Sequence, residues 1–214
     1  MPGFPCLTFE SDALPESQRF RAFAGTMSNF NFIQRRPGPF RAQAQAWRIG
    51  DIVLCTFSVT ALRYEQTQAM ADRIAADHFY INMHLSGEVV ADCGGGTLGG
   101  SADSLLVIYL RQSAVIDPSP EAALSLAIPR RLLLPRLQEF GLMPSGGLVP
   151  ILMRSVQAVA DSLPNLDQTH ATTLETMLAD LAGAVLVDAL RRAELGSSLD
   201  PVLAVEVRRF LQAN

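Results

Sequence analysis

The segment from His78 to Glu88 holds the side chains best suited to binding or catalysis. Its residues alternate between polar and apolar types as far as Leu85. In a β-strand such alternation sends His78, Tyr80, Asn82 and His84 to one face and the apolar residues to the other. Two imidazoles, a phenol and an amide on one face can exchange hydrogen bonds with a small molecule. We expect the apolar face to pack beneath helices and the polar face to line a pocket; the alternative is that the polar face is turned to water.

The same residues form a poor ligand set for a metal. A metal-binding barrel of the cupin type uses a close His-x-His pair, a Glu a few residues later and a third His on a later strand. Here His84 and Glu88 could serve, but the next histidine is His170, in an expected helix, and the chain has 3 His in total. We therefore expect neither a metal nor a cofactor. The alternative is a cupin-like metal-dependent enzyme, an isomerase or oxygenase, with His84 and Glu88 bound to the metal.

No other motif predicts a catalytic residue. The chain has no Gly-x-Ser-x-Gly, and none of its 3 Cys is near a histidine in the sequence. The glycine-rich run at 94–100 contains no Lys, so it predicts the flexible tip of a hairpin and not a phosphate-binding loop. Trp47 and Tyr64 each join an aromatic ring to a polar group, and we expect both to help line the pocket. Packing at the rim of the barrel is the alternative for both.

The elements that would position these side chains are short strands between residues 40 and 128. Gly50-Asp51 and Ser86-Gly87 are typical hairpin turns. Many short strands at this spacing favour an antiparallel barrel or jelly roll. We predict strands at 40–47, 52–59, 63–67, 79–85, 89–93, 105–110, 114–116 and 123–128.

After Pro129 the apolar period changes to that of helices. We predict helices at 130–140, 149–163 and 167–192, the last one capped by Asp167 or Thr169. The fold class is therefore α+β: an antiparallel β-barrel or jelly roll followed by a helical segment. The apolar stripe of 167–192 is wide enough to pack on the barrel and also to pair with a second subunit. The residues expected in that dimer interface are Leu174, Leu178, Leu181, Val185 and Leu186.

Composition narrows the class of protein. The chain has 214 residues, of which 49% are hydrophobic, so it can form a sizeable core. Its longest apolar runs are too short to span a membrane, and its first residues do not form a secretory signal. Three cysteines without a CxxC pair fit reduced thiols and a cytoplasmic location. The net charge of −4 argues against broad contact with a nucleic-acid backbone.

The order of these segments resembles the ligand-sensing N-terminal domain of AraC/XylS-type transcription regulators. The segments that carry the resemblance are 40–51, 80–87, 103–108 and 123–133. One departure is Ser101-Ala-Asp103, where the family usually has a Pro-Gly-Asp turn. The resemblance implies a cupin-like barrel without catalytic metal that binds a small-molecule effector, and helices that form a homodimer. DNA would be contacted only through a C-terminal domain that is not present in this chain.

The resemblance also divides the chain. Residues 1–130 would form the effector-binding barrel with an N-terminal arm, and 131–198 the helical dimerisation segment. Residues 199–214 carry an apolar stripe of Leu203, Val207, Phe210 and Leu211, and would begin a truncated helix-turn-helix domain. We therefore expect a sensing and dimerisation domain and not an enzyme. A further alternative is a protein that inactivates full-length regulators by forming mixed dimers with them.

Overall fold

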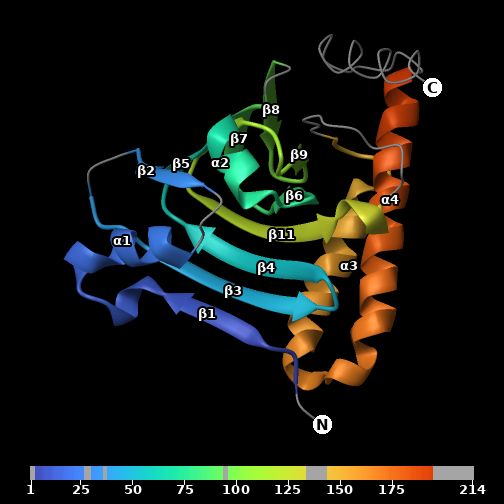
Figure 1. Ribbon diagram of the computed structural model, residues 1–214, viewed down its shortest axis with the longest axis horizontal. Helices are drawn as coiled ribbons and strands as arrows, with labels where there is room; N and C mark the ends of the chain where they lie inside the picture. The colour runs from blue at the N-terminus through green and yellow to red at the C-terminus, as the bar shows by residue number, and fades with distance from the viewer. Residues whose placement is uncertain (1–2, 27–29, 36–37, 94–95, 134–143, 195–214) are drawn as a thin grey trace.

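The computed structural model describes residues 3–26, 30–35, 38–93, 96–133 and 144–194 (Figure 1). The fold is α+β and cupin-like, with two antiparallel sheets and two long C-terminal helices. The six-stranded sheet has the order β1 (Cys6–Glu10), β3 (Ala42–Ile49), β4 (Ile52–Val59), β11 (Glu121–Pro129), β6 (His78–His84) and β9 (Leu105–Tyr109). The five-stranded sheet has the order β2 (Asn31–Gln34), β5 (Leu62–Gln66), β10 (Ala114–Pro118), β7 (Glu88–Asp92) and β8 (Thr97–Ser101).

The helices lie around these sheets. Two short helices, α1 (Glu16–Thr26) and α2 (Gln68–Ile74), belong to the barrel half of the chain. The long helices α3 (Val149–Ser162) and α4 (Ala171–Glu194) run side by side across the ends of β3, β4 and β11 (Figure 1). No helix in the described ranges is both long enough and apolar enough to cross a membrane.

The six-stranded sheet separates two apolar clusters because its side chains alternate between its faces. We call the cluster beneath α3 and α4 the helix-side core; it includes Trp47, Phe79 and Leu126. The cluster between the two sheets is the barrel core, and it includes Phe57 and Ile108. The barrel and the long helices therefore share one sheet, with one face for each.

Proline residues lie at both ends of α3, and an aspartate lies shortly before α4. Pro150 lies in the first turn of α3, and Pro164 follows its last residues. Asp167 accepts a hydrogen bond from the Thr169 backbone N–H at 2.9 Å, which begins a short 3₁₀ turn that leads into α4. Asp167 therefore caps this turn, whereas the predicted start of the long helix was four residues early because α4 begins at Ala171.

The five leucines and valines expected to bind a second subunit face this chain's own core instead. Leu178, Val185 and Leu186 are at most 1% exposed in the helix-side core. Leu174 and Leu181 are partly buried against the same core. The prediction was wrong in assigning the buried three to an intersubunit contact, because the sheet uses more of the wide stripe than we allowed for.

Each predicted strand is present, with small shifts in its ends. The glycine-rich run was wrongly expected to be only a flexible tip, because Thr97–Ser101 forms β8. Gly99 and Gly100 pair with Val90 and Val89 of β7, and Leu98 is buried in the barrel core. Backbone pairing and this one buried side chain outweigh the weak strand propensity of glycine.

Other expectations concern segments that are short or not described. At the start of the predicted helix 130–140 the structure has a 3₁₀ turn, Arg130–Leu132. Residues 134–143 and the expected terminal helix at 199–214 lie outside the described residues. The strands β1 and β2 and the helices α1 and α2 were not predicted.

The hairpin between β3 and β4 is fastened to α4. Gly50 adopts φ +59° in the turn, and the Asp51 backbone N–H donates to Glu175 Oε1 at 2.7 Å. Asp51 also forms an ion pair with Arg131, just after β11. A Cβ added to Gly50 would lie 2.6 Å from the Glu175 carboxyl carbon. Glycine is therefore favoured here by the backbone conformation, and any larger residue would also displace the end of the Glu175 side chain.

Candidate ligand site in the barrel interior

Strand β6 turns its polar face toward the inside of the barrel. Phe79, Ile81 and Met83 pack in the helix-side core, whereas Tyr80 packs against the barrel core. Asn82 and His84 follow Tyr80 on the same face and are 4% and 2% exposed. The strand therefore has the orientation that we expected, and the alternative with this face in water is wrong for Asn82 and His84.

His78 begins the same face at the end of the strand. It is partly buried, and its Nδ1 atom has no hydrogen-bond partner among the described residues. Burial lowers the pKa of His78, an effect that the neighbouring Asp77 carboxylate opposes. At neutral pH the imidazole is therefore uncharged and available as a hydrogen-bonding group.

A serine that the sequence analysis missed completes the polar set on the neighbouring strand. Ser125 of β11 is 1% exposed and lies opposite both Asn82 of β6 and Cys55 of β4. Burial raises the pKa of the Cys55 thiol to about 11, and a hydrogen bond with Ser125 opposes the rise. The alternation of Ala123-Leu-Ser-Leu-Ala127 puts this serine on the inner face, so strand periodicity alone could have found it.

Two expected tyrosines come together around an unpredicted phenylalanine. The ring centroid of Phe30 lies 6.2 Å from that of Tyr64 and 6.3 Å from that of Tyr80. Trp47 does not join them, because it is buried in the helix-side core on the opposite face of the sheet. The prediction that Trp47 lines the pocket was therefore wrong: β3 turns it toward α3 and α4.

Gln66 is a second inner polar residue that the sequence analysis missed. It ends β5, is 2% exposed, and its Nε2 donates to the Leu110 carbonyl at 2.7 Å. Its Oε1 atom and the Asn82 Oδ1 atom are buried, and neither has a partner within the described part of the chain. A polar residue at the end of a strand gives no sequence signal that distinguishes burial from exposure.

The residues proposed for a metal in the alternative hypothesis are not brought together. His84 is buried inside the barrel, whereas Glu88 is exposed at the start of β7, on the face opposite to the inward Val89. Among the residues described, no group of three or more His, Cys, Asp or Glu is placed to hold a metal ion.

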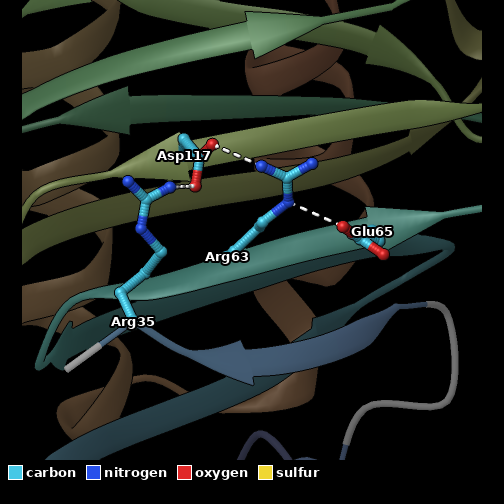
Figure 2. A network of polar contacts seen from close by, with 4 residues as sticks. All are labelled: Arg35, Arg63, Glu65 and Asp117. Carbon is cyan, nitrogen blue, oxygen red and sulfur yellow. Dashed lines mark hydrogen bonds and ion pairs between the residues drawn. The ribbon is translucent and has the colours of Figure 1, made fainter. Parts of the chain in front are cut away.

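A network of charges fastens the strand that follows Phe30. On the outer side of the five-stranded sheet, Asp117 of β10 lies between the guanidinium groups of Arg35 and Arg63 (Figure 2). Arg63 Nη1 is 3.0 Å from Asp117 Oδ2, and Arg63 Nε is 2.6 Å from Glu65 Oε1. The hydrogen bond to Glu65 is the main cause of a raised pKa at Arg63. Exposed pairs of this kind contribute little energy individually, but together they connect the end of β2 to β5 and β10.

The comparisons with known proteins agree with this architecture. The model of the AraC-binding-like domain matches residues 21–190, and the chain therefore belongs to that family. The structure of the AraC-like transcriptional activator CuxR is similar, with a TM-score of 0.75 and 16% identity over 95% of this chain and 84% of that chain. The chain is thus a regulatory ligand-binding domain of the AraC type.

Two further solved structures match less than half of this chain. A cupin superfamily protein from Desulfitobacterium hafniense DCB-2 has a TM-score of 0.34 and 14% identity over 45% of this chain and 84% of its own. AerE from Microcystis aeruginosa also has a TM-score of 0.34, with 13% identity over 46% of this chain and 45% of its own. A search of curated protein sequences gave no match.

Proposed function

We propose that this chain is the effector-sensing and dimerisation domain of a cytoplasmic transcription regulator and not an enzyme. The observation that carries the proposal is β6, which presents buried polar groups to the barrel and an apolar face to the long helices. A small molecule would contact Tyr64, Tyr80, Asn82 and His84, and His78 at the end of the strand. A DNA-binding domain outside this chain would respond to the bound state.

The shared sheet provides a physical route for that response. A ligand that fits one arrangement of β6 better than another shifts the population toward the better-fitting arrangement. Since Phe79, Ile81 and Met83 pack under α3 and α4, such a shift changes the packing of those helices. The coupling needs no contact between ligand and helix.

Thermal stabilisation by a library of small aromatic and polar compounds tests the effector site. A compound that raises the melting temperature of the wild type should lose its effect in Asn82→Ala. Gln45→Ala is the matched control, because Gln45 is exposed on the other face of the same sheet. Equal stabilisation of both variants would show that the ligand binds elsewhere.

For the dimer, we propose a contact on the side of α4 that exposes Asp180, Ala184 and Arg191, in place of the buried stripe. A groove of about 500 Å³ lies beside α4, and it is lined by Ala179, Gly183 and Ala184 of the helix together with Leu133 and Leu148 from outside it. Asp180 and Arg191 line the same groove. In an antiparallel arrangement of two copies, Asp180 of each copy faces Arg191 of the other, so the charges are complementary.

Sedimentation of the purified domain tests this interface. We expect a dimer for the wild type, a weaker dimer for Asp180→Arg, and recovery in the doubly exchanged Asp180→Arg/Arg191→Asp variant. A wild type that stays monomeric at micromolar concentration would rule the interface out.

The hypothesis of a metal-dependent enzyme has a direct assay. Purified protein would contain stoichiometric iron, zinc or manganese if that hypothesis were correct, and such a result would overturn the proposal of a non-enzymatic sensor.

A further inference from the structure

We propose that the effector is an uncharged, elongated molecule with a hydrogen-bond donor near each end, and that Gln66 and Asn82 are the acceptors. This inference rests on the proposed effector site and specifies the chemical class of its ligand. Gln66 is not among the residues that the sequence indicated.

The orientation of the Gln66 amide is fixed by its own contact. Nε2 donates to the Leu110 carbonyl at 2.7 Å, and a carbonyl can only accept. The Oε1 atom must therefore be the free end of the amide, and it is buried with no partner in the described residues. Only a donor from outside the described chain can satisfy it, and that donor is a ligand or a water molecule.

Asn82 provides the second acceptor further along the barrel. It is 4% exposed, lies opposite Leu106 of β9, and its Oδ1 atom has no partner in the described residues. Gln66 donates a hydrogen bond to Leu110, and Leu110 lies four residues after Leu106 in the sequence. Four residues of strand span roughly 13 Å, so the two acceptors mark the ends of an elongated site.

The side chains between these acceptors are aromatic. Tyr80 lies opposite Ile108, midway between Leu106 and Leu110, and Phe30 connects Tyr80 to Tyr64. Flat rings pack well against such a wall by edge-to-face or offset contacts. A ligand with aromatic rings between its two donors therefore fits both the wall and its ends.

The charge of the interior selects an uncharged ligand. The buried polar residues of the described chain are serines, Gln66, Asn82 and His84, with no carboxylate or guanidinium among them. Among the described residues, a buried anion would have only the imidazoles of His84 and His78 as possible counter-charges, and a buried cation would have none. Two amide oxygens as acceptors also favour N–H or O–H donors over carboxylates.

Calorimetric titration with three related probes tests the inference. The first probe is biphenyl with a para hydroxyl on each ring; the second carries methoxy groups in place of the hydroxyls, and the third carries carboxylates. We expect the dihydroxy probe to bind the wild-type domain, and the other two to bind at least tenfold more weakly. Gln66→Met and Asn82→Leu should each weaken the dihydroxy probe about tenfold, with far-UV circular dichroism confirming that both variants fold.

Each other outcome has a defined meaning. Equal binding of the dimethoxy probe would overturn the role of donors, and this result uses only the wild type. Tighter binding of the dicarboxylate probe would overturn the ligand class, while the proposed sensing function would stand. If none of the three probes binds, the acceptors are satisfied by water and the inference is wrong. The sensing proposal fails separately, when compounds from the library screen stabilise Asn82→Ala as well as the wild type.

Discussion

Replacement of Gly50 by alanine tests how the barrel is held against α4. Gly50 has φ +59°, a conformation that costs an alanine about 1 kcal/mol. The new Cβ would lie 2.6 Å from the Glu175 carboxyl carbon, so Glu175 would have to release the Asp51 N–H. That charge-assisted bond lies near the surface and contributes about 1 kcal/mol. We therefore expect Gly50→Ala to lower the free energy of unfolding by about 2 kcal/mol.

A double-mutant cycle separates the two contributions. Urea unfolding would be measured for the wild type, Gly50→Ala, Glu175→Ala and the double variant. In the Glu175→Ala background there is no carboxylate to displace, so Gly50→Ala should cost only the backbone contribution of about 1 kcal/mol. Additive costs in the double variant would refute the argument that displacement of Glu175 links the two residues.

Three further predictions concern the helices and the thiols. Leu178→Ala should lower the free energy of unfolding, measured in urea, by about 2–5 kcal/mol because Leu178 is fully buried. Met177→Ala, on the exposed side of α4, is the control and should lower it by less than about 1 kcal/mol. Native protein should react with Ellman's reagent at the exposed Cys6 alone, and the other two thiols, whose pKa values burial raises to about 11 and about 12, should react only in denaturant. Hydrogen bonds from Thr169 lower the pKa of Asp167, so the ionised carboxylate stabilises the fold. Asp167→Ala should therefore reduce the melting temperature near neutral pH. The difference in melting temperature between variant and wild type should disappear as the pH falls through the lowered pKa.

The strands were predictable because their residues either alternate between polar and apolar types, as in β6, or form short runs bounded by turn residues. Ile52–Val59 has the bounds that the sequence predicted, since Gly50-Asp51 fixes the turn before it. The orientation of β6 was predictable for the same reason, because only one of its faces is wholly apolar. Local pattern and tertiary packing agree in these segments.

Trp47 was assigned to the wrong face of its strand, and Gln66 was missed, because the environment of each depends on distant elements. In β3, Gln43, Gln45 and Trp47 share one face, but α3 and α4 cover only the end that holds Trp47. No local pattern tells where a covering helix stops. The buried Gln66 side chain donates to the carbonyl of Leu110, just after β9, a long-range contact that its neighbours in sequence do not indicate.

The position of Trp47 has a practical consequence for spectroscopy. The chain has a single tryptophan, and it lies 4% exposed between the six-stranded sheet and the long helices. Its fluorescence therefore reports on that junction and not on the proposed ligand site inside the barrel. A change in its emission on addition of a compound would record motion transmitted through the sheet, with no label and no quenching by direct contact. The intrinsic fluorescence of Trp47 can therefore be used to follow how ligand binding affects the contact between the sheet and the long helices.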